Sequence, residues 1–293
     1  MLARAGAPVT LIGRAEHVDA MSRHGVTIEF ADRSETVRVR ASTEVSAAAD
    51  TDVVLVCVKS PDTEAAAHSL APYVRRDTAI VSLQNGVDNA DKLRSVLDNL
   101  VYAAVVYVGT FMNGPGVVRH VGRGDLVLGA AREIASRPDV VARLPAIATM
   151  FERGGIPCPV TADIDAALWT KLTINCAFNA ISALSRSRYG RMVREPAVRG
   201  VMELAVREAV MVARASNVAL DEAVLIAEVR KVAEAMSEQY SSTAQDILRG
   251  KRTEIDSLNG YVARRGEALG VDVPVNRTMH ALVKLREAGD DLG

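Results

Sequence analysis

Three polar side chains recur at four-residue spacing within the apolar segment 169–184. Lys171, Asn175 and Asn179 occupy positions i, i+4 and i+8, a spacing that places side chains along one face of an α-helix. Asparagine is a poor residue for a helix interior because its carboxamide competes for backbone hydrogen bonds. We therefore expect this face to line a cleft that holds a small polar molecule, although each residue alone also fits a solvated stripe on an amphipathic helix.

Two polar clusters follow in the second half of the chain. The run 241–246, Ser-Ser-Thr-Ala-Gln-Asp, resembles a capping box, which explains Ser242 as a helix N-cap. Helix N-termini also bind carboxylates, so a substrate role for Ser242 stays open. Glu254 and Asp256 lie near the start of a further helix, where the helix dipole alone accounts for acidic residues.

The first half alternates strand and helix patterns. Val53–Val58 and Ala79–Leu83 are short continuous apolar runs, typical of strands covered on both faces. Val9–Ile12 is a third strand-like run, which we expect to be a buried strand. Because Pro61–Pro72 has the pattern of a helix, the sequence predicts βαβ units and a parallel sheet.

Polar residues follow each of these three runs, namely Arg14, Lys59 and Asn85. In an open α/β sheet the ligand crevice lies at the carboxyl ends of the strands, so together they indicate a nucleotide site. Singly, each also fits a solvated strand end or a common turn. An arginine after the second strand of a dinucleotide-binding unit accommodates a 2′-phosphate, whereas an acid binds the 2′-hydroxyl. Arg14, with Glu16 as the nearest acid, favours NADP over NAD.

No G-x-G-x-x-G occurs, although this fingerprint should precede a helix that ends at Gly6. We expect roughly 20 further residues upstream of Met1, carrying a first strand and the glycine loop. For the chain without them we expect low stability and weak cofactor binding.

The remaining segments divide the chain into two expected domains. In the first, residues 1–162, we expect further strands at 26–30, 36–40, 102–108, 116–121, 125–128 and 157–161, several of them separated by glycine turns, and a helix at 134–154. In the second, residues 163–293, we expect only helices, at about 165–186, 195–216, 221–238, 242–250, 254–269 and 276–288. The predicted fold class is α/β for the first domain, with a mostly parallel sheet, and all-α for the second.

Composition excludes several classes of function. The net charge of −1 gives no global field for nucleic acid or an anionic membrane. Cys57, Cys158 and Cys176 have neither disulfide-framework nor zinc-ligand spacing, so we expect no metal and a reducing cytoplasm. No apolar run approaches the ~20 residues that span a bilayer, so we expect a soluble protein. The oligomeric state stays open, with a homodimer among the outcomes, because amphipathic helices such as 195–216 can bury a face against a partner.

Five motifs together resemble the ketopantoate reductase family (2-dehydropantoate 2-reductase). They are the runs 58–60 (Val-Lys-Ser), 84–86 (Gln-Asn-Gly), 171–179, 241–246 and 253–260, in that order over essentially the whole chain. The resemblance implies a Rossmann-like first domain, a helical second domain, and NADPH-dependent reduction of 2-dehydropantoate to (R)-pantoate in pantothenate synthesis.

Residue roles carry over from the resemblance motif by motif. It implies Lys171 as the catalytic acid, Asn175, Asn179 and Ser242 as substrate-binding residues, and Glu254 beside substrate and cofactor. It also places Arg14, Lys59 and Asn85 on the cofactor side, with Asn85 close to the reacting centre. Many members have Asn-Gly where this chain has Tyr189-Gly190. The alternatives are a reductase of another 2-oxo acid and a non-catalytic NADP-binding protein, the latter because the glycine fingerprint is absent.

Overall fold

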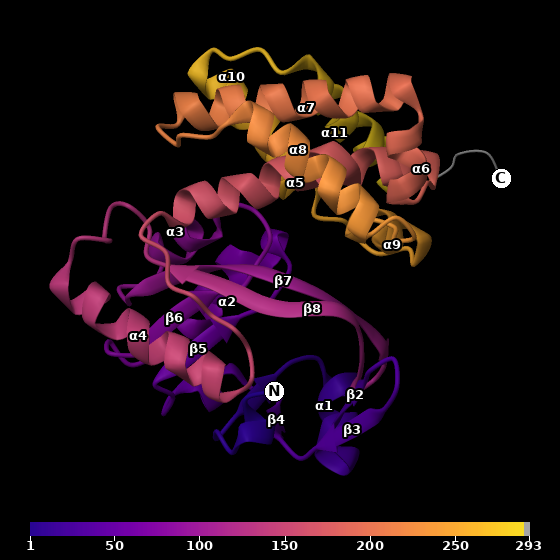
Figure 1. Cartoon of the computed structure of the whole chain (residues 1–293). Coiled ribbons are helices and arrows are strands. Elements are labelled where there is room, and N and C mark those ends of the chain that lie inside the picture. Colours follow the sequence, from indigo (N-terminus) through magenta and orange to yellow (C-terminus); the bar gives the residue numbers. More distant parts are fainter. Residues whose placement is uncertain (290–293) are drawn as a thin grey trace. The chain divides into compact units, whose positions relative to one another are not determined.

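The structure is a computed structural model that describes residues 1–289, and the contacts within it divide the chain into two units (Figure 1). Unit 1 comprises residues 1–58, 62–84 and 89–164. Unit 2 comprises residues 59–61 and 85–88 together with the described residues from 165 onward. The short segments that contain Lys59 and Asn85 therefore pack with the helical residues of unit 2.

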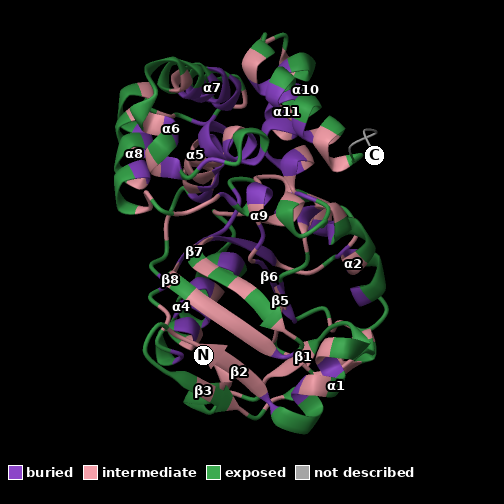
Figure 2. Cartoon of the chain, turned by 90° about the vertical axis from the view of Figure 1, so that its right-hand side faces the viewer, coloured by how far each residue is buried: buried purple, intermediate pink, exposed green. Residues whose placement is uncertain are grey.

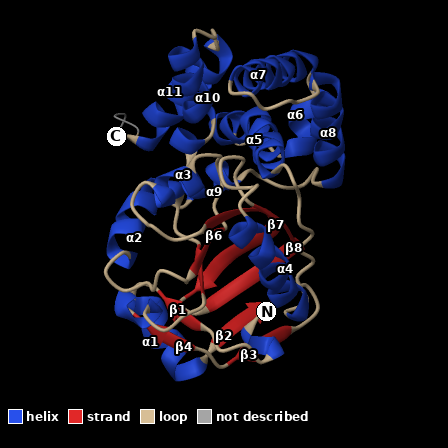
Figure 3. Cartoon of the chain, turned by 90° about the vertical axis from the view of Figure 1, so that its left-hand side faces the viewer, coloured by secondary structure: helices blue, strands red, loops and turns tan. Residues whose placement is uncertain are grey.

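Unit 1 contains a six-stranded mixed sheet (Figure 3). Its strands, in spatial order, are β3 (Ser34–Val37), β2 (Val26–Glu29), β8 (Val117–Gly129), β7 (Val101–Gly114), β6 (Ala79–Ser82) and β5 (Val53–Val56). Only the pairs β2–β3 and β7–β8 are antiparallel. The predicted mostly parallel sheet is thus confirmed. Every residue of β6 is buried, as its apolar run predicts, whereas β5 is mostly half-buried.

A second, two-stranded sheet corrects the expectation for the first apolar run. β1 (Thr10–Ile12) pairs in parallel with β4 (Arg40–Ser42). The strand is not buried, since Ile12 is 41% exposed and the other two residues are half-buried. Among the described residues β1 has β4 as its only strand partner, so an apolar composition here does not imply cover on both faces. The strand expected at 36–40 is in fact divided between β3 and β4.

The long hairpin β7–β8 replaces the three strands expected at 102–108, 116–121 and 125–128. Its turn lies between Gly114 and Val117, while Gly122 lies inside β8 opposite Gly109. A Cβ on Gly109 would stand 2.9 Å from the Val121 Cγ2 atom, so this glycine permits close strand approach. Glycine inside a strand was therefore misread as a turn signal.

Four helices belong to unit 1, namely α1 (Ala15–His24), α2 (Thr63–Leu70), α3 (Asn89–Arg94) and α4 (Pro138–Arg153), with short 3-10 turns at Ala3–Ala5 and Val45–Ala48. Of these helices, α3 packs against β6 and β7, and α4 packs against β8 over the hydrophobic core. A third 3-10 turn, Ser60–Asp62, begins in unit 2. α4 begins at Pro138, four residues later than expected, because proline is well suited to the first turn of a helix. Tyr102, Leu128 and Phe151 are fully or almost fully buried in this core. The strand expected at 157–161 is reduced to one bridge between Val160 and Leu128.

The described residues of unit 2 form helices joined by loops and contain no β-strand, as expected. Its elements are α5 (Ile164–Ser185), α6 (Tyr189–Arg194), α7 (Pro196–Ala215), α8 (Glu222–Ala235), α9 (Ser242–Leu248), the 3-10 turn η4 (Ile255–Ser257), α10 (Asn259–Leu269) and α11 (Pro274–Glu287). Only α6 was not expected. None of the helices within residues 1–289 is long and apolar enough to cross a membrane.

Helix α5 lies at the centre of unit 2, as its burial in Figure 2 shows. Leu172, Phe178 and Ala180 belong to three different hydrophobic clusters, so the helix is covered on several sides. A helix with so little solvent-facing surface is held in one orientation by its neighbours. Polar side chains on α5 are therefore presented in fixed directions.

Candidate active site

A chain of hydrogen bonds links an ammonium to a carboxylate through a carboxamide. The Lys171 Nζ donates to the Asn85 Oδ1 at 2.9 Å, and the Asn85 Nδ2 donates to the Glu254 Oε2 at 3.1 Å. The three residues come from α5, from the loop after β6, and from the residue just before η4, all within unit 2. The arrangement holds a directed proton donor that can stabilise negative charge on a substrate oxygen.

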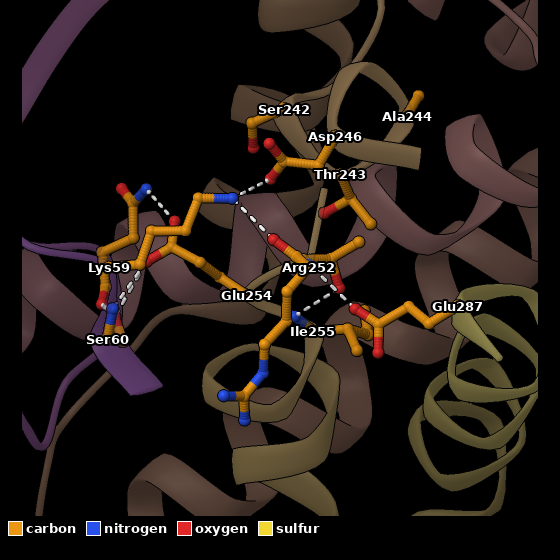
Figure 4. Close-up of polar contacts among 12 residues, drawn as sticks. Lys59, Ser60, Ser242, Thr243, Ala244, Asp246, Arg252, Glu254, Ile255 and Glu287 are labelled. Carbon is orange, nitrogen blue, oxygen red and sulfur yellow. Dashed lines mark hydrogen bonds and ion pairs between the residues drawn. The ribbon is translucent and has the colours of Figure 1, made fainter. Parts of the chain in front are cut away.

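Glu254 is also held on its other oxygen. Its Oε1 accepts a hydrogen bond of 3.1 Å from the backbone N–H of Ser60 and lies 3.0 Å from the Ser60 hydroxyl (Figure 4). Ser60 was not among the expected site residues, although it directly follows Lys59 in the motif at the end of β5. The sequence signal that could have identified Ser60 is its place next to Lys59 in the run 58–60.

Lys59 binds two residues, Asp246 and Arg252, that precede Glu254 in the sequence. Its Nζ forms an ion pair of 2.8 Å with the Asp246 Oδ2 and donates a 2.6 Å hydrogen bond to the Arg252 carbonyl oxygen. Burial raises the pKa of Asp246 above its ordinary value, even though the Lys59 ammonium works in the opposite direction. In Figure 4 the Arg252 guanidinium points away from Lys59. Asp246 was not expected to pair with Lys59, because the two are far apart in sequence.

The polar face of α5 continues beyond Lys171. Asn175 is half-buried, and within residues 1–289 its carboxamide has no hydrogen-bond partner. Asn179 is 2% exposed, and its Nδ2 donates to the hydroxyls of Ser242 at 3.3 Å and Thr243 at 3.2 Å. The structure thus brings Asn179 and Ser242 together. Thr243 is a further partner that the sequence did not indicate.

The cap of α9 corrects the interpretation of Ser242. The N-cap is Ser241, whose Oγ accepts a hydrogen bond of 3.0 Å from the Ala244 N–H and donates one to the Asn179 carbonyl. Gln245, three residues after Ser242, completes the capping-box pattern for Ser242, but the structure uses the preceding serine as the cap. Capping therefore does not account for Ser242. The hydroxyl of Ser242 accepts a hydrogen bond from the Asn179 side chain instead.

Arg14 belongs to unit 1, directly after Gly13 at the end of β1 and before α1. Its side chain is 79% exposed, with Glu16 at 4.0 Å. A Cβ on Gly13 would meet no atom within 4 Å, so the backbone here faces open space. Arg14 is thus an exposed cation at the end of β1, and the sequence contains no glycine fingerprint for a pyrophosphate.

The residues around Glu254 are fixed by a second network. The Thr253 N–H donates to the Glu287 Oε1 at 2.7 Å, and the Lys284 Nζ lies 3.1 Å from the Asp256 Oδ2. His280 Nε2 lies 2.7 Å from the Asp256 Oδ1. Since an ionised carboxylate only accepts, this ring nitrogen carries the hydrogen. Glu254 thus stands between two anchored residues.

Burial works against ionisation of both carboxyls in this network, but their hydrogen bonds outweigh it. The His280 and Lys284 hydrogen bonds hold the pKa of Asp256 below its ordinary value. The Lys284 and Thr253 hydrogen bonds do the same for the pKa of Glu287. The described residues contain no group of three or more His, Cys, Asp or Glu side chains placed to bind a metal ion.

Comparison with known proteins identifies the family to which this fold belongs. Residues 1–133 match the family described as ketopantoate reductase PanE/ApbA, and residues 163–287 match its C-terminal domain. A relative from Halobacterium salinarum, named 2-dehydropantoate 2-reductase, is 38% identical over 295 residues, covering 98% of this chain and 93% of its own. A relative of the same name from Pyrococcus horikoshii is 31% identical over 98% of this chain and 92% of its own.

Solved structures agree with the sequence comparisons. A PanE/ApbA family ketopantoate reductase from Ralstonia eutropha is 46% identical, with a TM-score of 0.90 over 98% of this chain and 93% of that one. A D-mandelate dehydrogenase described with NADH and anilino(oxo)acetate has the same TM-score at 22% identity, which shows a shared fold. The chain is therefore an oxidoreductase that acts on a CH–OH group. It belongs to the ketopantoate reductase family.

Proposed function

We propose that this chain reduces 2-dehydropantoate to (R)-pantoate with NADPH, as a step of pantothenate biosynthesis. The observation that carries the proposal is the hydrogen-bonded chain from Lys171 through Asn85 to Glu254, on a helix face that continues into Asn175 and Asn179. The names of the relatives from Halobacterium salinarum and Pyrococcus horikoshii support the same substrate.

In the proposed mechanism, Lys171 donates the proton to the substrate oxygen. NADPH, when bound, supplies the hydride for the C2 carbonyl of the substrate. Negative charge then develops on the carbonyl oxygen, and the Lys171 ammonium both stabilises that charge and donates a proton to it. The hydrogen bond to the Asn85 Oδ1 fixes the direction of the Nζ. Glu254 places a negative charge next to the Asn85 carboxamide and orients that group.

The proposed substrate contacts follow from what each side chain offers. The half-buried Asn175 carboxamide supplies one acceptor and two donors, which suits a hydroxyl or a carboxylate. The Ser242 hydroxyl, held by the Asn179 Nδ2, adds a directed polar group. Neutral donors of this kind hold an anionic substrate without competing with Lys171 for the proton.

The direct test is reduction of 2-dehydropantoate by the purified chain, followed by NADPH consumption and by identification of the product. We expect stoichiometric (R)-pantoate and a higher kcat/KM for 2-dehydropantoate than for a panel of other 2-oxo acids. Absence of pantoate in an assay that contains saturating NADPH would contradict the proposal.

A second candidate is reduction of another 2-oxo acid, and the local structure at Tyr189 favours it. The Tyr189 ring stacks on Phe178 with ring centroids 4.2 Å apart, and the residue is 8% exposed. Burial raises the pKa of this tyrosine. The side chain is thus committed to the core where many members of the family have an asparagine. A higher kcat/KM for a 2-oxo acid that lacks the hydroxyl of 2-dehydropantoate would favour this candidate.

The proposed NADP preference rests on Arg14. Arg14→Ala should lower the ratio of kcat/KM with NADPH to kcat/KM with NADH by about tenfold or more, because an exposed guanidinium that pairs with the 2′-phosphate is lost. Arg76→Ala is the matched control, since Arg76 is also exposed in unit 1. An unchanged cofactor ratio in Arg14→Ala would remove Arg14 from cofactor recognition.

A further inference from the structure

Ser60 lies between two members of the hydrogen-bonded chain. Its side chain and backbone are almost completely buried, with 2% of the residue exposed. The backbone N–H and the hydroxyl both approach the Glu254 Oε1, at 3.1 and 3.0 Å. The same hydroxyl lies 2.6 Å from the Asn85 carbonyl oxygen. One serine thus contacts the carboxylate and the backbone of the residue that links this carboxylate to Lys171.

The contacts at Oε1 restrict a rotation that is otherwise soft. The final torsion of a glutamate side chain is broad, so a carboxylate held at one oxygen alone can turn. With Oε1 held by Ser60, the Oε2 atom is left facing the Asn85 Nδ2 at 3.1 Å. The Asn85 carboxamide is in turn oriented with its oxygen toward the Lys171 Nζ. The direction of the ammonium therefore depends on Ser60 through two intermediate groups.

The Ser60 hydroxyl also couples the two groups that it contacts. A hydroxyl carries one proton, so it donates to either the Asn85 carbonyl oxygen or the Glu254 Oε1 at a given moment. The backbone N–H holds Oε1 in both cases. Removing the hydroxyl would loosen the Asn85 backbone and the Glu254 carboxylate together. Gly86, with φ of +99°, directly follows Asn85, so the loop there has a conformation that few other residues adopt.

We propose that Ser60 is a positioning residue that fixes Glu254 against the Asn85 carboxamide and thereby sets the direction in which Lys171 presents its proton. Ser60 acts through these residues and does not itself contact substrate in this mechanism. The kinetic consequences rest on the proposed function, whereas the geometric consequence does not.

The kinetic test compares Ser60→Ala with Ser60→Thr. Ser60→Ala should lower kcat for 2-dehydropantoate by about tenfold, the scale expected when a hydrogen bond to a charged group is lost. KM should change by less than about twofold, because the proposed substrate contacts Asn175 and Ser242 are untouched. Ser60→Thr restores a hydroxyl and should recover most of the lost kcat. Thr78→Ala removes a buried hydroxyl of unit 1 that donates to the Thr51 carbonyl, outside this network; it is the control and should leave kcat unchanged.

A turnover-independent measurement separates this proposal from the proposed function. In protein labelled with 15N-asparagine, the side-chain amide signals of Asn85 should shift in Ser60→Ala and return toward their original positions in Ser60→Thr. Unchanged Asn85 amide signals in Ser60→Ala would overturn the proposal, as would a full wild-type kcat in that variant. If the wild-type chain reduces no 2-oxo acid, the proposed function fails, and the amide signals still decide the role of Ser60.

Discussion

Asn175 and Asn179 lie four residues apart on α5, but their side chains have different environments. Asn179 is buried and donates to two hydroxyls, whereas the half-buried Asn175 has no hydrogen-bond partner within residues 1–289. A buried carboxamide with partners contributes to stability, while a partly exposed one without partners is available to a ligand. We therefore infer different roles for residues that the sequence pattern treats alike.

This difference predicts opposite outcomes for two alanine variants. Asn175→Ala should raise KM for 2-dehydropantoate by about tenfold and change the free energy of unfolding by less than about 0.5 kcal/mol. Asn179→Ala should lower the free energy of unfolding by about 1–3 kcal/mol, because it leaves the buried Thr243 hydroxyl without its partner. Steady-state kinetics and urea unfolding measure the two effects. An unchanged KM in Asn175→Ala would exclude Asn175 from substrate binding.

Among the structural elements, the segment from Thr253 through η4 into α10 determines where Glu254 lies. Glu287 of α11 binds the Thr253 N–H, and His280 and Lys284 of the same helix bind Asp256. A Cβ on Gly260 would stand 2.7 Å from the His280 ring, so only glycine allows α10 and this ring to approach so closely. The segment that carries Glu254 is thus anchored to α11 on both sides of that residue.

This anchoring predicts a stability that depends on acid pH. Because Asp256 and Glu287 have folded-state pKa values below their ordinary ones, their contribution is present above the unfolded-state pKa and is lost as pH falls through the folded-state value. Asp256→Asn should cost about 1 kcal/mol of unfolding free energy at neutral pH, a figure reduced for partial exposure. The wild-type and variant curves should converge below about pH 3, under the ordinary aspartate pKa.

Urea unfolding at several pH values measures this convergence. A matched control is Asp32→Asn, since Asp32 is an exposed acid of unit 1 paired with Arg33. A constant difference between wild type and Asp256→Asn across the acid range would contradict the assigned role of Asp256.

For the whole molecule, local patterns predicted the elements better than the contacts between them. Continuous apolar runs identified β5 and β6, and apolar periodicity identified α5 and α7 within a few residues. The hairpin β7–β8 was misread because a glycine inside a strand is explained only by the partner strand that approaches it. Burial of β1 was overestimated for the same reason, since cover depends on neighbours that the run itself does not contain.

The site residues show the same difference between local patterns, which the sequence encodes, and contacts between distant residues, which it does not. Spacing along one helix predicts a common face for Lys171, Asn175 and Asn179. The links from Lys171 to Asn85 and from Lys59 to Asp246 join residues distant in sequence, and no local pattern encodes them.

The domain boundary near residue 163 and a homodimer stay predictions. The helix that the homodimer prediction rests on, α7, has three apolar side chains that are each at least 40% exposed, namely Val201, Leu204 and Met211.

The central claim is that Lys171 supplies the proton in the reduction of 2-dehydropantoate. The most direct measurement is kcat of Lys171→Met at saturating NADPH and 2-dehydropantoate, together with an NADPH fluorescence titration of the same variant. We predict a fall in kcat of about 10²–10⁴-fold, the usual contribution of a general acid, with the Kd for NADPH changed by less than about twofold. Near-normal turnover in Lys171→Met would contradict the mechanism.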